Sequence, residues 1–136
     1  MKYTLIAVML GTAILAGAAQ ASKTTKDGVY TEAQAERGRK AYLSACASCH
    51  QEGLQGADLA PPLKGNDFLL PWSSQSVNDL FERIATTMPG DAPGSLPRDV
   101  DADIVAYVLQ VNKFPAGTEE LKPDVEAMKG IMIGKP

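Results

Sequence analysis

The run Cys46-Ala47-Ser48-Cys49-His50 decides how the rest of this sequence is interpreted. It holds the only two cysteines and the only histidine of the chain. Positions i, i+3 and i+4 share one face of a helix, so on a helix the two thiols and the imidazole would point the same way. A Cys-x-x-Cys-His run predicts covalent attachment of one c-type haem through Cys46 and Cys49, with His50 as an iron ligand.

Three other interpretations of this run explain less of it. A structural zinc site needs four ligands, usually two cysteine pairs or two cysteines and two histidines, and the chain has one histidine. A thioredoxin-like redox pair is expected beside a βαβ pattern, which the sequence lacks. A plain stabilising disulfide would give His50 no role. Haem attachment uses all three side chains.

The single histidine also restricts the second axial ligand of the iron. A second imidazole from the same chain is impossible, and methionine, the natural substitute, raises the reduction potential of cytochromes c. Met88 stands where a predicted helix meets a proline-rich loop, which would hold a thioether in a fixed direction with less entropy lost on ordering. Met128 and Met132 lie near the C-terminus and are expected to fill gaps in the core. We therefore predict Met88 as the sixth ligand.

The first 21 residues have the features of a secretory signal peptide. Lys2 precedes an apolar run over residues 4–19, and Ala19-Gln20-Ala21 supplies the small residues that a signal peptidase recognises. An uncleaved membrane anchor is the alternative, but the run is shorter than the roughly 20 residues that span a bilayer. We expect an exported, periplasmic protein that begins at Ser22 and has no membrane span after cleavage.

Helical periodicity predicts three main helices, over residues 31–50, from Ser76 to about Met88, and from Asp99 or Asp101 onward. Residues 51–65 and 89–97 are rich in glycine and proline, which predicts irregular loops. A further short helix is expected near Pro123. Strand patterns are almost absent.

Gly38 lies inside the first predicted helix. Glycine there costs about 1 kcal/mol of helix stability relative to alanine. We therefore expect another element to approach the helix closely at this residue.

The charge balance narrows the class of partner. After signal cleavage 12 basic residues face 16 acidic ones, a net charge of −4. The two signs are interspersed and form no basic stripe, so the chain lacks the electrostatic pattern of a nucleic-acid-binding protein. The expected partners are proteins.

The chain resembles a class I cytochrome c over roughly residues 30–114. The features that carry the resemblance are Cys46-x-x-Cys49-His50, Ala60-Pro61-Pro62-Leu63, Met88-Pro89 and the helix DIVAYVLQ. The resemblance implies an all-α, cytochrome c-like globular domain of three main helices wrapped around one covalently bound haem. It also implies that the first and last of these helices cross near Gly38 and Tyr107.

The resemblance further assigns residues around the haem. In this family a proline carbonyl in the loop after the haem motif accepts a hydrogen bond from the ligating imidazole, and Pro61 matches that proline best, with Pro62 as the alternative. Leu63 and Trp72 are expected in the haem environment. Tyr42 and Phe68 are expected to be packing residues.

The domain organisation follows from these expectations. We expect a signal peptide over residues 1–21, a flexible lead-in over residues 22–30, a cytochrome c domain over residues 31–114, and a C-terminal tail over residues 115–136 that packs on the domain.

A narrower resemblance covers residues 88–117 and the tail, which are similar to cytochrome domains and small cytochromes that serve quinoprotein alcohol dehydrogenases. It implies an electron carrier that accepts electrons from a quinoprotein or other periplasmic dehydrogenase and passes them to a downstream cytochrome or terminal oxidase. Two alternatives stay open. One is a haem enzyme or gas-reactive haem protein with an open or labile sixth position, and the other is a haem sensor, for which the sequence shows no output domain.

Overall fold

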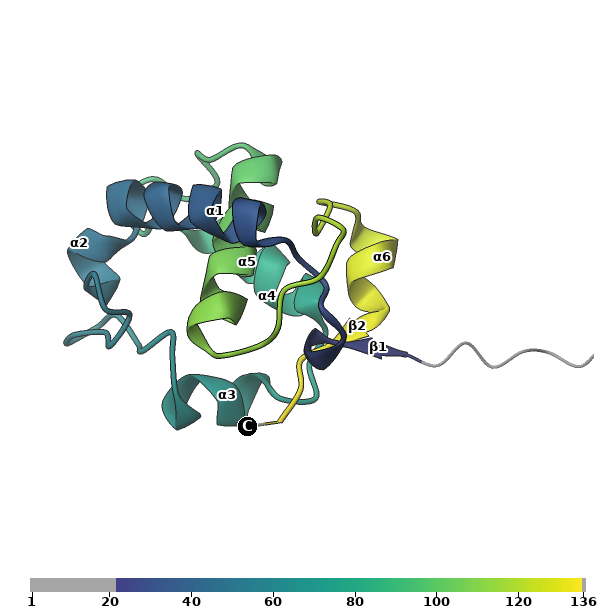
Figure 1. Ribbon diagram of the computed structural model, residues 1–136. Helices are drawn as coiled ribbons and strands as arrows, with labels where there is room; N and C mark the ends of the chain where they lie inside the picture. The colour runs from purple at the N-terminus through teal and green to yellow at the C-terminus, as the bar shows by residue number, and fades with distance from the viewer. Residues whose placement is uncertain (1–21, 136) are drawn as a thin grey trace, which may run out of the picture.

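The computed structural model describes residues 22–135, so the predicted signal peptide lies outside the described residues. In chain order the elements are β1 (Lys23–Thr24), the 3-10 helix η1 (Thr25–Asp27), α1 (Glu32–Ala45), α2 (Ala47–His50), α3 (Asn66–Trp72), α4 (Val77–Thr87), α5 (Arg98–Val111), α6 (Val125–Lys129) and β2 (Ile131–Met132). The helices pack together, with α1 lying across α5 (Figure 1). The predicted all-α fold class is confirmed. Within residues 22–135, every helix is too short or too polar to cross a membrane.

The crossing of α1 over α5 explains Gly38. A Cβ atom at this residue would lie 1.8 Å from the Asp103 carbonyl oxygen and 3.0 Å from the Tyr107 Cβ. Beside the crossing, the ring centroids of Tyr42 and Tyr107 are 5.5 Å apart, and Arg37 forms an ion pair with Asp103. The expectation that another element approaches α1 closely at Gly38, near Tyr107, is confirmed.

The helix predicted over residues 31–50 is in fact two helices. The backbone leaves helical geometry at Cys46, with φ −123° and ψ −33°. The Cys46 N–H still donates to the Tyr42 carbonyl, and its own carbonyl accepts from the His50 N–H at 3.0 Å. The polar groups at the break are thus satisfied without a glycine or proline, and for that reason the sequence pattern did not reveal it.

The helix α3 was not predicted. It begins after Gly65, whose φ is +72°, and it contains Pro71. Its seven residues are too few to show a clear helical period, and proline is unfavourable inside a helix because it has no N–H to donate. Two buried side chains, Phe68 and Leu69, attach α3 to the core.

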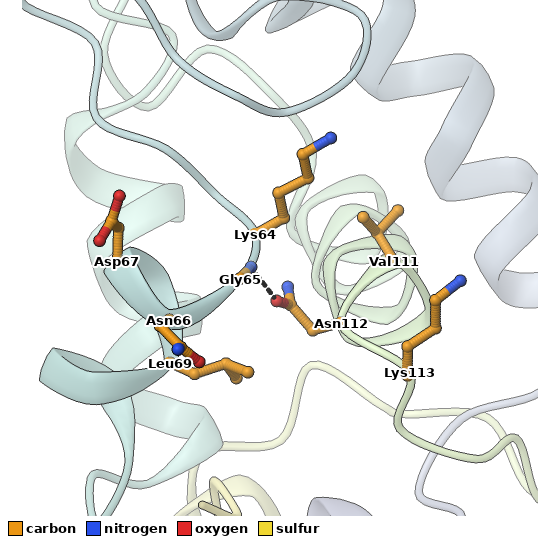
Figure 2. Close-up of a pocket in the computed structure, with 8 residues that line it drawn as sticks. All are labelled: Lys64, Gly65, Asn66, Asp67, Leu69, Val111, Asn112 and Lys113. Atoms are coloured by element: carbon orange, nitrogen blue, oxygen red, sulfur yellow. Dashed lines mark hydrogen bonds between the residues drawn. The ribbon is translucent and has the colours of Figure 1, made fainter. Parts of the chain in front are cut away.

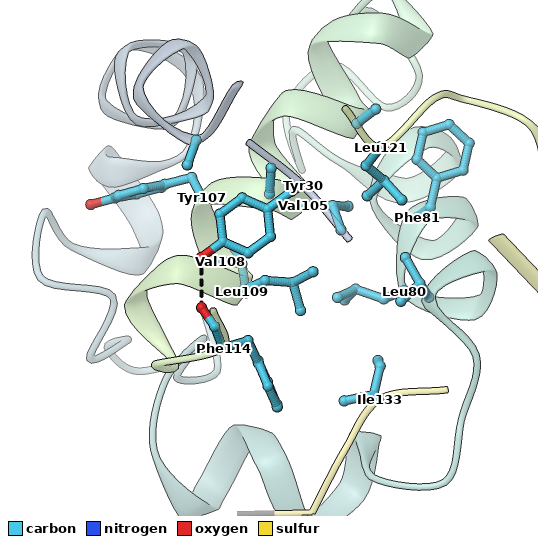
Figure 3. Close-up of a cluster of buried hydrophobic side chains, with 14 of the residues drawn as sticks. Tyr30, Leu80, Phe81, Val105, Tyr107, Val108, Leu109, Phe114, Leu121 and Ile133 are labelled. Carbon is cyan, nitrogen blue, oxygen red and sulfur yellow. Dashed lines mark hydrogen bonds between the residues drawn. The ribbon is translucent and has the colours of Figure 1, made fainter. Parts of the chain in front are cut away.

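The segment 22–30 differs from the flexible lead-in that we expected. β1 pairs in parallel with β2, with Lys23 opposite Ile131 and Thr24 opposite Met132. Tyr30 is 1% exposed, and its hydroxyl donates to the Phe114 carbonyl at 2.6 Å (Figure 3). Polar local composition suggested mobility, but the contacts that order this segment come from the far end of the chain.

The hydrophobic core lies between α4, α5 and the tail (Figure 3). α4 begins with a capping box between Ser76 and Asp79. Its buried apolar side chains face those of α5, and the residues after Pro115 add Leu121, Met128, Ile131 and Ile133 to the same cluster. The short helix α6 begins after Asp124, close to the predicted position. Most of the core is therefore made by the C-terminal half of the chain.

Gln34 attaches α1 to the tail, and its removal should be costly. Its side chain is 2% exposed; the amide nitrogen donates to the Leu121 carbonyl and the amide oxygen accepts from the Leu121 N–H, both at 2.8 Å. Gln34→Ala leaves the Leu121 N–H and carbonyl without hydrogen-bond partners and creates a cavity. We therefore expect a loss of about 2–4 kcal/mol in the free energy of unfolding, measured by denaturant titration.

The matched control is Gln110→Ala, because Gln110 makes its side-chain hydrogen bond to Glu32 at the protein surface. That variant should lose less than about 1 kcal/mol. Equal losses in the two variants would contradict the role assigned to Gln34.

Candidate functional site

Helix α2 and the break before it present the three side chains of the Cys-x-x-Cys-His run. Cys46 is half-buried at the break, Cys49 is exposed, and His50 is buried. Cys46 and Cys49 are not joined in a disulfide. The predicted haem-attachment residues therefore lie together, at the break and on the single helical turn that follows it.

The imidazole of His50 is fixed by the loop that follows it. Its Nδ1 atom lies 2.8 Å from the Pro61 carbonyl oxygen. A carbonyl oxygen only accepts, so Nδ1 carries the hydrogen, and in the neutral ring Nε2 then keeps a free lone pair. The structure places Pro61 rather than Pro62 at this contact. The neutral imidazole has the tautomer that a metal ligand needs.

Two further hydrogen bonds hold the backbone on the C-terminal side of His50. The Gly56 N–H donates to the His50 carbonyl at 3.0 Å, and the Tyr42 hydroxyl donates to the Gln51 carbonyl at 2.6 Å. Tyr42, which we expected only to pack, thus also positions the chain beside the imidazole. Burial raises the pKa of its hydroxyl, so the hydroxyl stays protonated and keeps donating.

Asn112, which the sequence did not predict as a site residue, holds the backbone at Leu63 by hydrogen bonds. Its amide nitrogen donates to the Leu63 carbonyl at 2.9 Å. Its amide oxygen accepts from the Gly65 N–H at 2.9 Å, as Figure 2 shows. Leu63 itself is half-buried against the core. An asparagine directly after a helix is common, so the sequence carried no distinguishing sign of this role.

A groove of about 550 Å³ lies between the start of α3 and the end of α5 (Figure 2). Lys64, Asp67 and Lys113 are among its lining residues. None of the residues predicted to bind haem or iron lines it. The groove is therefore not the predicted haem site, although Asn112 and Gly65 belong to both surroundings.

Trp72 ends α3 and is half-buried, with its ring centroid 6.1 Å from that of Phe68. Phe68 is 1% exposed, as expected for a packing residue. The place of Trp72 thus depends on α3, the helix that the sequence did not predict.

Met88 is half-buried at the C-terminal end of α4. Its N–H donates to the Ile84 carbonyl at 3.0 Å, and its carbonyl accepts from the Gly94 N–H at 3.1 Å. The backbone of Met88 is therefore held on both sides. By contrast, Met128 is 0% exposed in the core, and Met132 lies in β2.

These residues fit a covalently bound haem. Burial, with smaller effects from Asp101 and Cys49, raises the pKa of the Cys46 thiol to about 11, so the position favours an uncharged sulfur such as a thioether. Cys46 and Cys49 would hold the haem, and His50 and Met88 are the candidate iron ligands. The haem would supply an iron centre that gains and loses one electron. The chain's own part is to orient the imidazole and to hold the thioether.

Comparison with known proteins identifies the family of the chain. The family model described as "Cytochrome C oxidase, cbb3-type, subunit III" matches residues 33–108, more than half of the 136-residue chain. No curated protein matches. The crystal structure of the sulfane dehydrogenase SoxCD from Paracoccus pantotrophus is similar with 22% identity and a TM-score of 0.49, over 71% of this chain and 53% of that one. The chain thus spans about half the length of that relative.

The matched range contains the Cys-x-x-Cys-His run, Pro61, Leu63, Trp72 and Met88. The chain belongs to the family of cbb3-type cytochrome c oxidase subunit III and is a class I c-type cytochrome.

Proposed function

We propose that this cytochrome is a periplasmic electron carrier with one covalently bound haem and His/Met ligation, which accepts electrons from a quinoprotein or other dehydrogenase and passes them to a downstream cytochrome or terminal oxidase. Membership of the family implies haem-based electron transfer. The observation that supports His50 as an iron ligand is the hydrogen bond that its Nδ1 donates to the Pro61 carbonyl. This hydrogen bond leaves Nε2 free for iron.

Met88 completes the proposed ligand pair. Its backbone is held at both the N–H and the carbonyl, so only the side-chain rotamers remain to be ordered when the thioether binds a ligand. A second strong ligand leaves the iron without a free position for a substrate or gas. Such a centre is suited to electron transfer rather than to bond making.

The proposed partners are redox proteins. The net charge of −4 after signal cleavage would steer the carrier toward basic surfaces. Residues 88–117 support a dehydrogenase as the donor, through their similarity to the cytochromes of quinoprotein alcohol dehydrogenases.

Carbon monoxide tests the carrier against the open-site alternative. With His50 and Met88 both bound to iron, the visible spectrum of the reduced protein should not change within the time of mixing with carbon monoxide. Rapid formation of a carbon monoxide complex would instead indicate an open or labile sixth position, and the carrier proposal would then be wrong.

The donor is tested separately, by mixing a reduced quinoprotein alcohol dehydrogenase with the oxidised cytochrome and following haem reduction. Reduction supports this class of donor. Absence of reduction removes the dehydrogenase from the proposal and leaves the carrier function standing.

A further inference from the structure

The carboxyl group of Asp101 lies in an unusual place for a charged side chain. Asp101 stands in the first turn of α5 and is 1% exposed. Both of its carboxylate oxygens are buried, and neither has a hydrogen-bond partner among the described residues. An ionised carboxylate is strongly disfavoured in such surroundings, so this group gains a proton easily.

The charged groups around Asp101 leave it without a compensating cation. Arg98 is the nearby positive charge, but its guanidinium is hydrogen-bonded to Glu82 of α4 and lies over the Phe81 ring. Asp99 and Glu82 add negative charge. Burial, the main cause, together with these two carboxylates outweighs Arg98 and raises the pKa of Asp101 to about 6.

Asp101 also lies within electrostatic reach of the haem-attachment run. Its negative charge contributes to raising the pKa of the Cys46 thiol. Cys46 lies at the junction of α1 and α2, so the charge of Asp101 reaches the residue that is predicted to bond the haem. A charge that acts on the sulfur of Cys46 would also act on a haem bonded to that sulfur.

We propose that Asp101 is a proton-binding site coupled to the oxidation state of the haem. When the haem accepts one electron from its protein donor, the carboxylate takes one proton from water and becomes a neutral carboxylic acid. On oxidation the electron passes to the acceptor protein and the proton returns to water. This inference rests on the proposed haem attachment at Cys46.

The sign of the coupling follows from the charges. The oxidised centre carries one more positive charge than the reduced centre, and that charge favours the carboxylate form of Asp101. The reduced protein therefore binds the proton more tightly, by about tenfold, which corresponds to about 59 mV for a one-electron couple. The reduction potential should be flat at low pH, fall through the region around pH 6, and be flat again above it.

Spectroelectrochemical titration between about pH 5 and pH 8 tests the proposal. The wild-type protein should show the fall in potential. Asp101→Asn removes the titrating group and stays neutral, so its potential should remain near the acidic wild-type value at every pH. Asp99→Asn is the matched control, because it removes an exposed charge of the same helix turn and should keep the pH-dependent step.

Two results would overturn the coupling: a wild-type potential that is flat across this range, or the same step in Asp101→Asn as in wild type. Failure of the haem proposal is distinguishable, because the purified protein would then have no haem spectrum and no potential to titrate.

A second measurement uses the wild-type protein alone, in case Asp101→Asn does not fold. Infrared difference spectra between the oxidised and reduced protein are recorded near pH 6. Reduction should produce the C=O band of a protonated carboxylic acid, and labelling aspartate with ¹³C at its side-chain carboxyl should shift that band. A band that the label leaves in place belongs to a glutamate or to a haem carboxyl group, and that result, like the absence of a band, contradicts the proposal.

Discussion

Gly38→Ala is expected to destabilise the folded protein by about 3 kcal/mol or more. The added Cβ would lie 1.8 Å from the Asp103 carbonyl oxygen, where ordinary contact needs at least 3.4 Å. That oxygen belongs to the backbone of α5, so the strain is relieved only by moving the two helices apart. The helix preference for alanine returns about 1 kcal/mol, which is too little to compensate. Denaturant titration measures the loss.

Gly90→Ala is the matched control for this variant. No atom lies within 4 Å of a Cβ built at Gly90, so the stability should change by less than about 0.5 kcal/mol. A Gly38→Ala protein as stable as wild type would show that the helices do not cross at this distance.

Met88→Ala is expected to remove the sixth iron ligand. The Met-to-iron charge-transfer band should disappear from the spectrum of the oxidised protein, and the reduction potential should fall by a sizeable part of the roughly 0.8 V that axial ligands span. The reduced variant should also bind carbon monoxide within the time of mixing, since its sixth position is open. Visible spectra and a redox titration measure these changes.

Met132→Ala controls for the loss of a methionine as such. Met132 is half-buried in β2, so its removal should lower stability slightly and leave the charge-transfer band in place. A band that survives in Met88→Ala and is lost in Met132→Ala would assign the ligand to the tail.

Local sequence patterns were sufficient wherever a few neighbouring residues set the outcome. The Cys-x-x-Cys-His run predicted a c-type cytochrome, the class to which the chain belongs, and α4 begins at the capping box that Ser76 and Asp79 predict. Gly38 predicted the close approach of another element, because a glycine inside a helix lowers helix stability unless the absence of a side chain is needed for packing. These features depend on spacing and on backbone preference, which act over one or two helical turns.

Contacts between distant segments could not be foreseen in the same way. The break at Cys46 has no glycine or proline to mark it, and the order of residues 22–30 comes from pairing with a strand more than 100 positions later. The helix α3 contains a proline, so local preference argued against it. In each case packing outweighed a weak local preference, and the energies that decide packing are not visible in a short window of sequence.

The candidate site shows the same division. Residue types and spacing alone predict Cys46, Cys49 and His50 as the residues that hold a haem, and they predict a methionine as the sixth ligand. Only the tertiary structure shows that the Pro61 carbonyl, rather than that of Pro62, accepts the hydrogen bond from the imidazole. Only the tertiary structure shows that the Asp101 carboxylate is buried with no hydrogen-bond partner among the described residues. The reason is physical: the chemistry of a side chain belongs to the residue itself, whereas its hydrogen bonds and its exposure to water depend on how the whole chain folds around it.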